Sequence, residues 1–143
     1  MKGILRGLTE NRAKTDPTSD DPRLLGRTYA IPFENVWQAA RGLAAGDLRG
    51  WSLWVANDRD GFIEASARPI LFGAVGDVRV EVGLDENAQT RVDLTAASRT
   101  QRGDFGRSRR TIGGFLRALD KALQVRPGQI LDATRTPAWL DPQ

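Results

Sequence analysis

An arginine-rich stretch carries the side chains in this sequence that are best suited to binding chemistry. Between Arg99 and Arg126 there are eight basic and two acidic residues, a net charge of +6, whereas the whole chain carries only +3. A guanidinium group donates paired hydrogen bonds to a phosphate or a carboxylate. We therefore predict an anion or an acidic partner for a surface made of Arg99, Arg102, Arg107, Arg109, Arg110 and Arg117.

A helix is expected to position most of these arginines. Apolar residues recur at helical spacing in the same stretch, namely Ile112, Phe115, Leu116, Leu119 and Leu123. Arg107, Arg109 and Arg110 then fall in a first turn, where the helix dipole disfavours cations. Backbone N–H groups together with three guanidinium groups favour a bound anion at this point.

A structural role is the alternative for the same stretch. Asp104 or Ser108 can cap the helix by accepting hydrogen bonds from its first N–H groups, and Arg99 can bond Asp104. The adjacent Gly113 and Gly114 each cost about 1 kcal/mol relative to Ala inside a helix. We therefore expect either a neighbouring backbone or another protein to come very close to these two glycines.

The composition excludes several kinds of chemistry, because the chain has neither Cys nor His. Imidazole bases, thiolates and Cys- or His-ligated metals are ruled out, so we expect no metal, no cofactor and no catalytic residue. The catalytic alternative is an enzyme that uses only carboxylates, with Glu64, Asp93 or Asp104 as candidates. It needs two carboxylates that converge in an open cleft.

The sequence also limits the location and the partners. It lacks a run of about 18 apolar residues, and its N-terminal apolar segment is too short for a signal peptide. We expect a cytoplasmic protein without a transmembrane segment, and leave open a place at the periphery of a membrane complex. A nucleic acid is not expected, because aromatic residues for base stacking are not interleaved with the basic ones.

The pattern of apolar residues predicts the order strand, helix, four strands, helix. The expected strands are Thr28–Ile31, Trp51–Asn57, Phe62–Arg68, Val78–Leu84 and Val92–Ala96, and the first helix follows Pro32. This order predicts an α+β fold with a single antiparallel sheet covered on one face by two helices. The β-α-β-β-β-β-α order resembles the TATA-binding-protein-like and helix-grip topologies. We expect an extended N-terminal arm at residues 1–27, the α+β domain at 28–124 and a C-terminal tail at 125–143.

Two segments outside the expected helices and strands carry large apolar side chains. Leu71 and Phe72 fall in a connection between strands, and Trp139 falls in the C-terminal tail. An exposed tryptophan is an effective interface anchor. We therefore name Leu71, Phe72 and Trp139 as candidate partner-binding residues.

Several short motifs resemble one known family. They are Gly26-Arg27-Thr28-Tyr29, Val36-Trp37, Gln89-Thr90-Arg91-Val92-Asp93, and Ser98-Arg99 followed by Asp104-Phe105-Gly106. From Leu25 to Leu123 the chain resembles domain-of-unknown-function family 1499, a bacterial and plastid family without an assigned reaction. At the last motif Arg110 and Ile112 follow the family pattern, whereas Ala96, Phe105, Ser108 and Thr111 stand where the family has Ser, Leu, Asn and Arg.

We expect a non-catalytic binding or assembly protein. In the first hypothesis it is an accessory subunit that contacts an acidic protein or a membrane complex through the arginine-rich stretch and its tails. In the second it carries a small apolar ligand between the sheet and the helix Ile112–Leu123. The carboxylate-only enzyme is the third.

Overall fold

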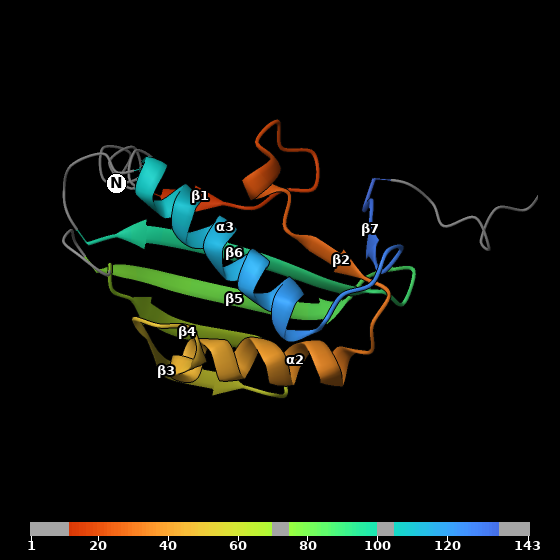
Figure 1. Ribbon diagram of the computed structural model, residues 1–143, viewed down its shortest axis with the longest axis horizontal. Coiled ribbons are helices and arrows are strands. Elements are labelled where there is room, and N and C mark those ends of the chain that lie inside the picture. The colour runs from red at the N-terminus through yellow and green to blue at the C-terminus, as the bar shows by residue number, and fades with distance from the viewer. Residues whose placement is uncertain (1–11, 70–74, 100–104, 135–143) are drawn as a thin grey trace, which may run out of the picture.

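The chain folds into one antiparallel sheet with two helices across one of its faces (Figure 1). The computed structural model describes residues 12–69, 75–99 and 105–134. The sheet order is β3-β4-β5-β6-β2-β7, and β1 pairs with β6 beside β2. This arrangement confirms the α+β fold and the two covering helices that the sequence predicts.

The elements have the following bounds. The strands are β1 Arg12–Lys14, β2 Arg27–Tyr29, β3 Trp51–Asn57, β4 Phe62–Ala67, β5 Gly76–Leu84, β6 Thr90–Ser98 and β7 Ile130–Leu131. The helical segments are η1 Pro22–Leu24, α2 Phe33–Gly42, η2 Leu43–Asp47 and α3 Phe105–Ala122. Two strands, β1 and β7, come from the segments expected as arm and tail. They contain three and two residues, too few for a periodic pattern to show.

The core lies between the sheet and the two helices. Val78, Val80 and Val82 of β5 are buried on the helix side, and the residues between them lie on the opposite face. On α3 the predicted apolar stripe is buried, with Ile112, Phe115, Leu116 and Leu119 at most 1% exposed. Val36, Trp37 and Ala40 form the matching stripe of α2.

The opposite face of the sheet carries ion pairs. Arg79 of β5 contacts Glu64 of β4 at 3.1 Å, and Arg91 contacts Asp93 of its own strand at 2.8 Å. Arg79 lies opposite Thr95 in β6, whereas Glu81 lies opposite Asp93, a pair of like charge.

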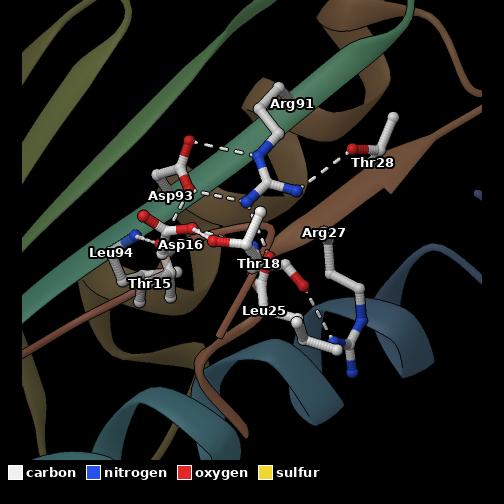
Figure 2. Close-up of polar contacts among 10 residues, drawn as sticks. Thr15, Asp16, Thr18, Leu25, Arg27, Thr28, Arg91, Asp93 and Leu94 are labelled. Carbon is white, nitrogen blue, oxygen red and sulfur yellow. Dashed lines mark hydrogen bonds and ion pairs between the residues drawn. The ribbon is translucent and has the colours of Figure 1, made fainter. Parts of the chain in front are cut away.

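Arg91 and Asp93 fasten the N-terminal segment to β6 (Figure 2). The Arg91 guanidinium donates to the Leu25 carbonyl at 2.6 Å and to the Thr28 hydroxyl at 3.1 Å. Asp93 accepts from the Thr15 hydroxyl at 2.7 Å. These contacts hold residues 15–28 along β6, so the strand motif around Arg91 has a structural function.

Candidate functional site

A hollow of about 470 Å³ lies between the sheet and the N-terminal half of α3. We call it the α3 pocket. Its apolar lining residues are Leu48, Trp51, Ala67, Pro69, Ala96 and Phe115, its basic ones are Arg49, Arg68, Arg107 and Arg110, and Ser98, Ser108, Thr111, Gly76 and Gly114 complete it. The residues come from the loop before β3, the start of β3, the ends of β4 to β6, and α3.

The floor of the α3 pocket is aromatic and buried. Trp51 at the start of β3 and Phe115 of α3 are 8% and 0% exposed, and their ring centroids are 4.9 Å apart. Ala67 and Ala96 are also buried, and their short side chains leave space above the sheet. An apolar group placed here would lose its contact with water, which favours binding.

Arginines form the rim of the same pocket. Arg49, Arg68 and Arg110 are exposed, whereas Arg107 is half-buried. Within the described ranges, the side chains of Arg49, Arg68 and Arg110 make no ion pair or hydrogen bond, and no acidic residue is among those that line the pocket. The rim therefore concentrates positive charge at the opening of an apolar hollow.

The two adjacent glycines of α3 have different surroundings. A Cβ at Gly113 would lie 3.2 Å from Cγ of Arg23, so η1 packs closely against the helix there. The close approach that the sequence predicts is thus made by a side chain rather than by backbone. A Cβ at Gly114 would meet nothing nearer than Nη2 of Arg117 at 3.9 Å. Gly114 lines the α3 pocket, and its missing side chain keeps that part of the pocket open.

The structure divides the predicted arginine surface among several places. Arg107 and Arg110 line the α3 pocket, and Arg117 is exposed further along α3. Arg109 pairs with Asp21 of the N-terminal segment at 2.9 Å. Hydrogen bonds from the Arg23 backbone and side chain, and then from Arg109, lower the pKa of Asp21 to about 2.

Arg99 lies on the opposite face of the sheet. It pairs with Asp77 at 2.8 Å, and its guanidinium is 5.4 Å from the centroid of the Trp54 ring. The hydrogen bond to Asp77 raises the pKa of Arg99. Asp104, the partner that the sequence suggests for Arg99, lies outside the described residues.

A second hollow, of about 550 Å³, lies on that opposite face beside Trp54. Four of its five charged groups have partners, since Arg79 contacts Glu64 and Arg99 contacts Asp77, and Arg12 is the fifth. The indole N–H of Trp54 donates to Ser66 at 3.2 Å. Such paired groups have less to gain from a charged ligand, so the α3 pocket is the stronger candidate site.

A protein family matches most of the chain. The family described as "Protein of unknown function (DUF1499)" matches residues 9–119. The chain belongs to the DUF1499 family. No curated protein and no solved structure matches it significantly. The match confirms the resemblance seen in the motifs, and it begins earlier than Leu25, so that it includes β1 and η1.

The DUF1499 motif at the start of α3 coincides with the α3 pocket. Arg110, which follows the family pattern, lies on its rim. Ser108 and Thr111, which depart from it, line the same pocket, and Ser108 is buried. Three of the four departures, Ala96, Ser108 and Thr111, therefore change residues that line this pocket of the DUF1499 protein.

Two rim residues, Arg49 and Arg68, were not among the sequence-based candidates. They are brought together by the β3–β4 hairpin, in which Trp51 pairs with Ala67. The backbone N–H of Arg68 donates to the Gly50 carbonyl at 2.8 Å. Counting outward from the turn Asn57–Gly61 on both strands could have placed these arginines at the same end of the hairpin.

Two of the three candidate carboxylates, Glu64 and Asp93, do not line the α3 pocket, and Asp104 lies outside the described residues. Glu64 contacts Arg79, and Asp93 contacts Arg91 and Thr15. In the part of the chain that the structure describes, no group of three or more acidic side chains could hold a metal ion.

The other predicted site residues fall in parts of the chain that the structure does not describe. Arg102, Leu71, Phe72 and Trp139 lie outside the described residues. Within the described ranges, none of the helices has the length and apolar character to cross a bilayer.

Proposed function

We propose that this DUF1499 protein is a non-catalytic carrier that binds a small amphipathic anion in the α3 pocket. The observation that carries the proposal is the pairing of a buried aromatic floor with an arginine rim in one hollow. This combines two sequence-based expectations, a carrier with its ligand between sheet and helix, and an anion site formed by arginines.

The size of the α3 pocket suits a small molecule. Its volume of about 470 Å³ lies within the range of about 300–1,000 Å³ that is common for small-molecule sites. Apolar lining with a few polar groups is also typical of such sites. A flat surface patch for a protein partner would need neither the hollow nor the buried aromatic floor.

The burial of the lining residues defines how the ligand is oriented. Trp51 and Phe115 are buried, whereas Arg49, Arg68 and Arg110 are exposed. The apolar part of the ligand therefore enters first and packs on the floor of the pocket, where part of Trp51 is still exposed. Its anionic end stays at the rim, where it remains partly hydrated and accepts hydrogen bonds from guanidinium groups.

Gly114 supports a binding role for this space. A glycine inside a helix costs about 1 kcal/mol relative to Ala, and the surroundings of Gly114 have room for a side chain. Packing therefore does not require this glycine. A ligand that occupies the space beside Gly114 would explain why a glycine stands at this position.

A second candidate function is the accessory subunit that contacts an acidic protein or a membrane complex. Arg110 and Arg117 favour it, because both are exposed and their seven-residue spacing places them on one face of α3. In this case the acidic partner binds across the helix surface, and filling the α3 pocket should not weaken its binding.

Displacement of the fluorescent probe ANS by dodecanoate tests the carrier. We expect dodecanoate to bind the purified protein and dodecyltrimethylammonium to bind about tenfold more weakly or not at all. Gly114→Leu should fill the pocket and abolish binding of dodecanoate. Ala122→Leu places the same side chain at an exposed position at the end of α3 and should bind as the wild type does. Equal binding by the two variants, or no binding of dodecanoate by the wild type, contradicts the proposal.

A further inference from the structure

We infer that the anionic end of the ligand is a phosphate monoester rather than a carboxylate. This inference rests on the proposed function, and it specifies the chemical class of the ligand. Three observations carry it: the number of rim cations, the separate segments from which they come, and the way this protein pairs its own carboxylates.

The charge of the rim exceeds that of one carboxylate. Arg49, Arg68 and Arg110 contribute three positive charges, and they make no ion pair with the residues that the structure describes. A carboxylate neutralises one of them. A phosphate monoester at neutral pH carries a charge of about −1.5 to −2, so it matches the rim better.

The geometry of the rim also favours a phosphate. Arg49 precedes β3, Arg68 follows β4, and Arg110 belongs to α3, so their side chains start from three different segments. A carboxylate is planar and offers two oxygens, which suits one guanidinium in a paired arrangement. A phosphate monoester offers three terminal oxygens in different directions, and each can accept from a guanidinium of a different segment.

The carboxylates of this protein show how many arginines one such group takes. Among the arginines that the structure describes, Asp77 pairs with Arg99 alone, and Asp120 with Arg27 alone. Asp21 pairs with two arginines, Arg23 and Arg109, which is the largest number among these three carboxylates. The three rim arginines Arg49, Arg68 and Arg110 therefore outnumber the arginines that pair with any of these carboxylates.

Ligands with one chain and different head groups test the inference. Dodecyl phosphate, dodecyl sulfate and dodecanoate share the apolar body, and sulfate shares the tetrahedral shape of phosphate but carries a single charge. At about pH 7.5 dodecyl phosphate should bind about tenfold more tightly than the other two. Its advantage over dodecyl sulfate should shrink at about pH 5, because the second phosphate proton binds with a pKa near 6.

Variants of the rim show whether the arginines cause this preference. Arg68→Gln with Arg110→Gln should bring dodecyl phosphate down to the affinity of dodecyl sulfate. Arg59→Gln is the matched control, since Arg59 is exposed in the β3–β4 turn and should leave the preference intact. Inorganic phosphate alone and vesicles that contain phosphatidic acid then distinguish a free phosphate from a lipid head group. A strong preference for inorganic phosphate over dodecyl phosphate contradicts an apolar body.

The outcomes separate the two proposals. If all three dodecyl anions bind equally well, or if the double variant keeps the phosphate preference, the inference is wrong and the carrier function stands. If none of them binds, the carrier function itself is wrong, and the inference falls with it.

Discussion

The hydroxyl of Tyr29 on β2 donates a 2.6 Å hydrogen bond to the carboxylate of Asp120 on α3. Tyr29 is fully buried, and Arg27 pairs with the same carboxylate at 2.9 Å. Burial, and then the bond to Asp120, raise the pKa of Tyr29 far above its ordinary value, so the hydroxyl keeps its proton. The pair fixes the second half of α3 to the sheet, and this leaves the first half of the helix as one wall of the α3 pocket.

We predict that Tyr29→Phe destabilises the protein by about 1–2 kcal/mol, because a buried hydrogen bond is lost while Asp120 keeps Arg27. Asp120→Asn should cost more, since it leaves Arg27 without its carboxylate. Urea unfolding at neutral pH measures both. An unchanged midpoint for Tyr29→Phe would show that the bond to Asp120 does not contribute to stability.

The pKa of Asp21 predicts a dependence of stability on acid. Because this pKa falls from 3.8 to about 2 on folding, the folded state favours the ionised form. The contribution is fully present above about pH 4, and it is lost as the pH falls from there toward 2. Asp21→Asn should therefore show a shallower loss of stability in this range. Urea midpoints measured for both proteins from neutral pH to pH 2 check it, and parallel curves would contradict it.

The two glycines of α3 should respond differently to alanine. Gly114→Ala should stabilise the protein by up to about 1 kcal/mol, because the helix gains propensity and the new Cβ has space. Gly113→Ala should gain less or lose stability, because its Cβ would press on the side chain of Arg23 at 3.2 Å. Thermal unfolding of the two variants makes the comparison. Equal gains would mean that η1 moves aside without cost.

Much of the fold was predictable, because its long elements have clear periods. Strands β4 to β6 alternate over six to nine residues, and α3 keeps its apolar stripe from Ile112 to Leu119. The alternation of β6 also implies the position of Arg99. Ser98 is buried on the helix side, so the next side chain must lie on the other face.

The candidate site was less predictable, because it depends on contacts between distant segments. Arg49 and Arg68 reach one end of the β3–β4 hairpin only through strand pairing. Residues that are adjacent in sequence can also lie in different sites, because the fold directs their side chains to different neighbours. Arg109 lies next to Arg110 along the chain, yet helical geometry directs it toward Asp21, while Arg110 lies at the pocket.

Without a ligand, the arginine rim should make the protein less stable than a variant that lacks one of the rim arginines. Arg110 shares the α3 pocket with Arg49 and Arg68, and no acidic side chain lines the described part of that pocket. Like charges in one place repel each other, and the repulsion weakens as salt screens it. Replacing Arg110 by Gln should therefore raise the free energy of unfolding by a few tenths of a kcal/mol at low salt, roughly the size of a surface charge interaction.

This gain in stability should come with a loss of ligand binding. Arg110→Gln should bind dodecyl phosphate more weakly than the wild type, and its extra stability should disappear at about 1 M salt, where the screening length is about 3 Å. Arg59→Gln is the control for the loss of a surface charge, and it should change neither quantity. Urea unfolding at two salt concentrations and ANS displacement provide the two measurements. A variant that is destabilised at low salt would show that Arg110 stabilises the fold. This result would contradict the view that the rim arginines are present for ligand binding.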